Sequence, residues 1–182
     1  MNYKVRRSAL ALATLFALSA CATAETHSAR SPNYDRMPKK IFAVAALGAG
    51  FPEAPLQKNQ THFAEKFRSY LQSCGISADI LFVDTTALHL IADEKIKKFD
   101  PDSVLYIQWT KATLQQGALI DGIYHLDMRD MIGNVIVWNA NVELKTNAYN
   151  TAFSYNDILL ISIINQMAAD KMIPANCLIQ DK

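Results

Sequence analysis

The sequence lacks a strong charge of either sign, which argues against one large class of function. Its 182 residues carry 18 Lys and Arg against 17 Asp and Glu, a formal net charge of +1. Proteins that bind nucleic acid draw much of their affinity from basic side chains that neutralise phosphates. The chain is therefore a poor candidate for a nucleic-acid-binding protein.

The sequence also lacks the spaced motifs of the common catalytic and metal sites. "GAG" at residues 48–50 has neither the Gly-Lys-Ser/Thr ending of a phosphate loop nor the third glycine of a dinucleotide turn, and there is no G-x-S-x-G elbow. No two histidines stand at metal-ligand spacing. His125 and Asp127 share one face of a predicted strand and form a weak candidate pair, for which a solvated face is the alternative. We expect no metal, no cofactor and no enzymatic activity.

The sequence contains no apolar run long enough to span a bilayer. Residues 8–18 are almost wholly apolar, and about eleven residues make a helix of roughly 16 Å against a hydrocarbon core of roughly 30 Å. Lys4, Arg6 and Arg7 precede this run, and small residues follow it. This layout is typical of a secretory signal.

The end of this run, Leu18-Ser19-Ala20-Cys21, resembles the bacterial lipobox. The resemblance implies cleavage after Ala20, a diacylglycerol on the Cys21 sulfur and an acyl chain on the freed amine. An ordinary cleaved signal and a transmembrane anchor are the alternatives. Ala22 stands where Asp would mark retention in the inner membrane, so we expect an outer-membrane protein that faces the periplasm.

These features predict three parts: a signal peptide over residues 1–20, a flexible tether over residues 21–38, and one domain over residues 39–182. The tether is rich in Ala, Ser, Thr, Asn and charge, with little to bury. Loss of the signal leaves 15 basic and 17 acidic residues, so the mature chain has a net charge of −2.

Two cysteines are left once Cys21 is lipidated, Cys74 and Cys177. Both follow predicted helices, and the periplasm is oxidising. We predict a Cys74–Cys177 disulfide; the alternative is two separate thiols.

Periodicity predicts an α/β domain with the order β-α-β-α-β-β-β-α. Apolar runs and alternation indicate strands over residues 40–47, 78–84, 103–110, 123–129 and 135–144. Helical spacing indicates helices over residues 61–74, 85–99 and 158–172. We expect a two-layer sandwich with a mixed sheet of about five strands. The last helix is apolar on most faces, so it lies either in the domain's own core or partly against a partner.

The last two strands form a hairpin that, with the preceding strand, resembles a group of small outer-membrane lipoproteins. In that group an aspartate introduces a strand, and a hairpin with a glycine and a tryptophan follows. The group includes uncharacterised families and, more remotely, the curli secretion lipoprotein, the lipoprotein activators of penicillin-binding proteins and the N-terminal domain of the Tol system's periplasmic protein. The residues that fit are Asp102, Val104, Leu105, Asp127 or Asp130, Gly133, Val137 and Trp138.

The resemblance implies an α/β domain used for protein–protein contact in the cell envelope. The hairpin has no long membrane-inserting segment, which counts against a curli-type pore. Trp109 and Trp138 are candidate contact residues because tryptophan carries much interface energy, and the alternative for at least one of them is packing in the core. A protein-interaction module that binds an envelope protein or associates with itself is the first hypothesis. The alternatives are a module that binds a small or lipidic ligand between the last helix and the sheet, and an envelope hydrolase around His125 and Asp127.

Overall fold

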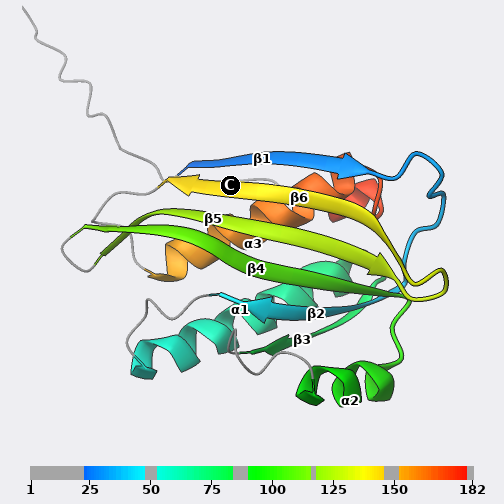
Figure 1. The fold of residues 1–182 in the computed structure, drawn as a ribbon, viewed down its shortest axis with the longest axis horizontal. Helices are drawn as coiled ribbons and strands as arrows, with labels where there is room; N and C mark the ends of the chain where they lie inside the picture. The colour runs from blue at the N-terminus through cyan, green and yellow to red at the C-terminus, as the bar shows by residue number, and fades with distance from the viewer. Residues whose placement is uncertain (1–22, 48–52, 84–89, 116–117, 146–151, 180–182) are drawn as a thin grey trace, which may run out of the picture.

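The protein is an α/β domain built on one mixed sheet of six strands (Figure 1). The structure is a computed structural model that describes residues 23–47, 53–83, 90–115, 118–145 and 152–179. The sheet has the order β1-β6-β5-β4-β2-β3. Its strands are β1 (Thr23–Arg30), β2 (Lys40–Ala46), β3 (Ser77–Phe82), β4 (Ser103–Gln115), β5 (Ala118–Asp130) and β6 (Val135–Lys145). The helices are α1 (Glu53–Ser73), α2 (Leu90–Phe99) and α3 (Ala152–Ala169), followed by the short η1 (Ala175–Cys177).

The sheet is parallel in its first part and antiparallel in its second. Strand β2 pairs in parallel with β3 and β4, because helical connections bring the chain back to the same edge. The pairs β4–β5, β5–β6 and β1–β6 are antiparallel. The α/β class and the mixed sheet are as predicted from the sequence, but the sheet has six strands rather than about five, and helices on both of its faces replace the predicted two-layer sandwich.

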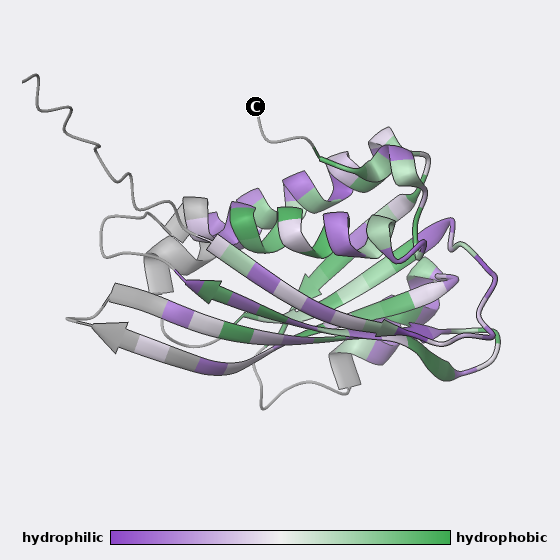
Figure 2. Ribbon diagram, turned by 90° about the horizontal axis from the view of Figure 1, so that it is seen from above, coloured by the Kyte–Doolittle hydropathy of each residue, from purple (hydrophilic) through white to green (hydrophobic). Residues whose placement is uncertain are grey.

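The helices cover the two faces of the sheet unequally. Helices α1 and α3 pack on one face, and α2 packs on the other (Figure 2). The larger core lies under α1 and α3, and most of the buried side of α3 is apolar, with Leu159, Leu160, Ile163, Ile164 and Met167 in the core. The smaller core lies between α2 and the β2–β4 part of the sheet. Within the described ranges, no helix is long and apolar enough to span a membrane.

Strand β1 is the main correction to the sequence prediction. Residues 23–30 fall within the predicted tether, yet they pair along their whole length with residues 138–145 of β6. The segment has no large apolar side chain, so composition alone indicates a tether. Its alternation is nevertheless regular: Ala24, Thr26, Ser28 and Arg30 are half-buried, and the residues between them are exposed. The folded domain therefore begins at or before Thr23, and Cys21 and the signal lie outside the described residues.

A partly buried cluster of polar side chains around Asp170 holds the edge strand β1 against the end of α3. One carboxylate oxygen of Asp170 accepts hydrogen bonds from Ser28 Oγ and from the Trp138 indole, each at 2.6 Å. Gln166 Nε2 donates to Ser28 Oγ at 2.8 Å and to the other Asp170 oxygen at 3.1 Å. Hydrogen bonds to a charged group contribute about 1.5–3 kcal/mol each. The cluster therefore stabilises the position of β1, whose small side chains bury little apolar surface.

Other boundaries also differ from the prediction. Helix α1 begins at Glu53, eight residues before Thr61; its Pro55 lies in the first turn, where a missing N–H costs no helical hydrogen bond. Strands β4 and β5 extend through most of the segment expected to connect them. Helix α3 begins at Ala152, six residues before the predicted start at residue 158. Part of the predicted helix 85–99 lies outside the described residues.

The Cys74–Cys177 disulfide is confirmed, with the two sulfur atoms 2.03 Å apart. It joins the end of α1 to η1, and so ties the C-terminal segment to the helix layer. The bridge spans 103 residues of sequence. Loop-closure entropy predicts a stabilisation of about 4–5 kcal/mol for a bridge of this span, as an upper guide.

Tyr155 of α3 inserts over Gly122 of β5. A Cβ atom at Gly122 would lie 1.9 Å from the Tyr155 hydroxyl oxygen, so only glycine leaves room for this side chain. Burial raises the pKa of Tyr155 to about 12 and raises the pKa of the neighbouring Tyr124 well above 10.

We expect the free energy of unfolding to fall as pH rises from about 10 to about 12. In the unfolded chain Tyr155 loses its proton near pH 10, whereas in the folded protein it keeps the proton until about pH 12. The stabilisation is therefore complete below pH 10 and is lost through this window. Denaturant melts of the wild type and of Tyr155→Phe at several pH values test this. The variant should lose less stability across the window, and equal losses in both proteins would contradict the assignment.

Candidate functional site

The face of the sheet on which α2 packs is an open polar surface over much of β4, β5, β6 and β1, because α2 covers only the part around β2 and the start of β4. The strand register places Gln108, His125, Asn141 and His27 in one row across these strands. The next row contains Tyr106, Asp127 and Asn139. Open sheet faces of this kind present their side chains at fixed spacing.

A groove of about 380 Å³ lies where this face meets α2. Asp93 of α2 lines one wall, and Tyr106, Gln108, His125, Asp127 and Arg129 line the sheet side. The volume is within the range of small-ligand sites, and the lining offers both donors and acceptors. The groove can hold a polar group by hydrogen bonding.

His125 is the centre of the groove's polar contacts. Its Nδ1 lies 2.9 Å from the Asn141 side-chain oxygen, and its Nε2 lies 3.3 Å from a carboxylate oxygen of Asp127. The structure thus brings together the pair that the sequence suggested. Both ring nitrogens of His125 already have partners in Asn141 and Asp127. Tyr106 carries the hydroxyl group that the described lining residues offer as a nucleophile. This arrangement serves binding better than nucleophilic catalysis.

An exposed apolar tip adjoins the groove at the turn between β5 and β6. We call it the hairpin tip and define it by Met131, Ile132, Val135 and Ile136. These side chains are 38%, 76%, 54% and 49% exposed. Ile136 belongs to both the tip and the groove lining, so the two surfaces are continuous. Clustered exposed apolar side chains are typical of interaction sites, whereas scattered ones are not.

Asp130 fixes the shape of the hairpin tip. Its carboxylate is almost fully buried and accepts hydrogen bonds from Arg36 Nη2 at 2.6 Å and from the Gly133 backbone N–H at 2.5 Å. The Met131 N–H donates to the Asp102 carbonyl at 2.9 Å. The apolar side chains are therefore exposed by a turn that is held in place. The hydrogen bond from Arg36 to Asp130 joins the segment before β2 to this turn. Met37, the next residue in that segment, is 50% exposed.

Of the two tryptophans predicted as contact residues, burial contradicts Trp138, whereas Trp109 is half-buried and stays a prediction. Trp138 is 1% exposed, its ring is in the core, and its N–H donates to Asp170, so it is unavailable to a partner. The reason is a β-bulge: Arg129 pairs with Ile136 and Met128 with Trp138, which leaves Val137 as the extra residue. Trp109 is half-buried against the core and donates its N–H to the Lys111 carbonyl at 2.7 Å.

The hairpin tip is not among the residues predicted from the sequence. Residues 130–134 lie between the two predicted strands of the hairpin, and Met131 and Ile132 belong to this turn. Two large apolar residues in an exposed turn were the available signal, since turns favour Gly, Asn, Asp, Pro and Ser.

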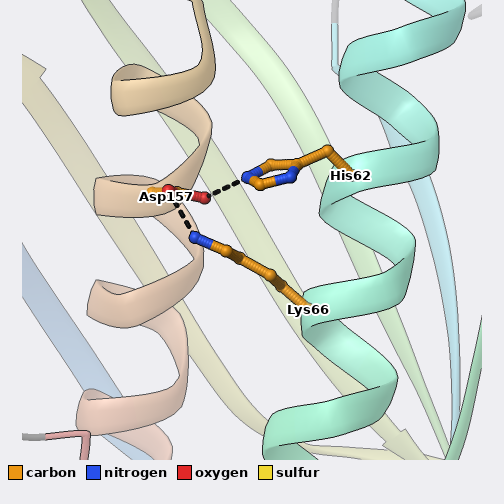
Figure 3. Close-up of polar contacts among 3 residues, drawn as sticks. All are labelled: His62, Lys66 and Asp157. Atoms are coloured by element: carbon orange, nitrogen blue, oxygen red, sulfur yellow. Dashed lines mark hydrogen bonds and ion pairs between the residues drawn. The ribbon is translucent and has the colours of Figure 1, made fainter.

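A second polar cluster joins α1 to α3 on the other side of the sheet (Figure 3). Asp157 of α3 lies between His62 and Lys66, which are one turn apart on α1. Its two carboxylate oxygens lie 3.0 Å from His62 Nε2 and 2.5 Å from Lys66 Nζ. Each oxygen contacts one side chain of α1, so the cluster connects the two helices and we assign it to stability.

Comparisons with known proteins give no family for this chain. No protein-family model and no curated protein matches it. Among solved structures, the PelC dodecamer from Paraburkholderia phytofirmans is 17% identical; the match covers 78% of this chain and 95% of that one, with a TM-score of 0.48. A putative neuraminyllactose-binding hemagglutinin homolog from Helicobacter pylori is 12% identical, with coverages of 79% and 91% and a TM-score of 0.40. At these scores the similarities carry no argument about this chain.

Proposed function

We propose that this chain is a lipid-anchored protein of the outer membrane whose periplasmic domain binds an envelope protein through the hairpin tip. In this proposal the domain serves envelope assembly or transport and catalyses no reaction. The single observation that carries the binding role is the hairpin tip itself: four exposed apolar side chains on a turn held by the buried Asp130. Such a surface contributes binding energy without a large ordering cost, because it is already in place.

The anchor is supported by the signal layout and by Cys21, and the fold is compatible with it. Strand β1 begins two residues after Cys21 and runs toward the start of β6, where the hairpin tip lies. Eight residues of strand extend about 27 Å. The lipid and the hairpin tip are therefore at opposite ends of β1 and do not compete for one surface.

Binding of a small polar ligand in the groove beside α2 is the second candidate function. The observation that favours it is the convergence of His125, Asp127 and Arg129 in a groove of about 380 Å³. A lipid site between α3 and the sheet has less support, since the side chains of α3 that face the sheet are fully buried in the core. An envelope hydrolase has no supporting observation among the described residues beyond the His125–Asp127 contact.

Mass spectrometry of the mature protein from native membranes tests the anchor. We expect an N-terminal peptide that begins at Cys21 and carries a diacylglyceryl group and a further acyl chain. Two or more acyl chains hold a protein stably on a bilayer. An unmodified N-terminus, or release of the protein by osmotic shock, would contradict the anchor.

Photo-crosslinking in cells, with a crosslinkable residue at position 132, tests the binding surface. We expect a discrete adduct with an envelope protein. We expect Val135→Asp to reduce its yield at least about tenfold, because burial of one such side chain contributes about 1.5–3 kcal/mol and 1.4 kcal/mol is a factor of ten. Gln72, exposed on α1, is the control site, and Gln72→Asp is the control variant. Equal adducts at positions 72 and 132, or no effect of Val135→Asp, would rule out the hairpin tip.

A further inference from the structure

Among the strands of the described residues, β1 has a neighbour on one side only, so its other edge is open to them. The Ser31 N–H donates to the Val137 carbonyl, and antiparallel hydrogen bonds recur at every second residue. The odd-numbered residues of β1 therefore bond to β6. Ala24, Thr26, Ser28 and Arg30 direct their backbone N–H and C=O groups to the open edge. Such an edge is a template for another strand.

A stripe of α3 lies beside this open edge. It consists of Ile158, Ser162, Gln166 and Ala169, whose spacing of four, four and three residues places them on one side of the helix. These side chains and those of Ala24 and Thr26 line a groove of about 530 Å³. None of these six side chains is charged, so covering them removes no charge from water.

We infer that a second copy of this chain covers both features, with the two β1 strands paired antiparallel about a two-fold axis at Thr26. A single added strand would satisfy the open edge but leave the α3 stripe uncovered. A second copy brings a β1 edge and an α3 stripe in the same relative positions, as an isologous two-fold interface requires. The result is one continuous sheet of two six-stranded halves.

The sequence of β1 is complementary to itself in this register. Thr26 pairs with the second copy's Thr26 and Ala24 pairs with Ser28, through the backbone groups that face the open edge. On the outer face, Glu25 lies opposite His27 of the other copy, and His27 lies opposite Glu25. Within one chain these two exposed side chains are already 3.1 Å apart. An imidazole N–H can donate a hydrogen bond to the facing carboxylate, and paired threonines are favourable across antiparallel strands.

The inner face also permits the approach of two copies. Ala24, Thr26 and Ser28 are small, and so are Ser162 and Ala169 of the α3 stripe. The two α3 helices run antiparallel across the axis, and small residues allow the close distance at which helices pack.

Cysteine crosslinking of the full-length protein in cells tests the inference. Residues on the two-fold axis face their own copies with Cβ atoms about 5 Å apart, within reach of a disulfide after small adjustment. We expect Thr26→Cys to give a disulfide-linked homodimer on non-reducing gels. Ala29→Cys is the matched control, because Ala29 is exposed on the same strand but pairs with Thr23 of the other copy. We expect at least tenfold less dimer from the control.

A second variant tests the α3 stripe. We expect Ser162→Arg to raise the dimer dissociation constant of the detergent-solubilised mature protein at least tenfold in sedimentation velocity. Gln72→Arg places the same side chain on exposed α1 and should leave the constant unchanged. A thermal melt checks that Ser162→Arg is folded.

The dimer is overturned if the wild type stays monomeric at all concentrations, if Ala29→Cys crosslinks as well as Thr26→Cys, or if Thr26→Cys joins a different protein. Val135→Asp separates this inference from the proposed function. It should leave the dimer intact while it reduces capture at the hairpin tip.

Discussion

The pairing of β1 with β6 is the constraint on which the rest of the account depends. It converts a polar segment directly after Cys21 into the edge strand of the sheet. Asp170, at the end of α3, stabilises this pairing by accepting hydrogen bonds from Ser28 of β1 and from Trp138 of β6. Because one carboxylate bonds to both strands, β1, β6 and the end of α3 hold one another in position. In the sequence, only Ala22 separates Cys21, the proposed lipidation site, from β1.

The same pairing determines which surfaces are available. On one face α1 and α3 bury the apolar side of the sheet, whereas on the other face α2 leaves β4, β5, β6 and β1 open. The bulge at Val137 turns Trp138 into the core and leaves Ile136 beside Arg129 on the open face. Asp130 then fixes the turn that carries Met131 and Ile132. At the far edge, β1 and α3 together form the groove proposed for a second copy. In the proposed dimer, antiparallel pairing places the two Thr23 residues at opposite ends of the β1 pair, so the proposed anchors would reach one leaflet only when the two-fold axis is perpendicular to the membrane.

The sequence predicts the parts of this fold that depend on apolar periodicity. Phe63, Phe67 and Leu71 identify α1, and the alternation around Leu126 and Met128 identifies β5, because burial of these side chains decides the local structure. The disulfide follows from the compartment and from two cysteines that each end a helical element. Strand β1 is not predictable in this way, since its stability comes from backbone pairing and from Asp170, 140 residues further along the chain. The exposure of Ile136 in the hairpin tip and the burial of Trp138 depend on a β-bulge. The alternation of residues 135–144 does not predict this bulge. The His125–Asp127 contact was predictable because both side chains lie on one face of one strand.

Amide hydrogen exchange of residues 23–30 in the full mature protein tests the central claim most directly. Backbone pairing with β6 predicts that the amides of His27 and Ala29 exchange at least about a hundredfold more slowly than those of an unstructured peptide, as expected for hydrogen bonds that open only by local unfolding. It also predicts that Asp170→Ala accelerates exchange in β1 more than in β2, because only β1 loses its side-chain support. Exchange across residues 23–30 at the unstructured rate in the wild type would contradict the pairing, and with it the position of the anchor, the open edge and the proposed dimer.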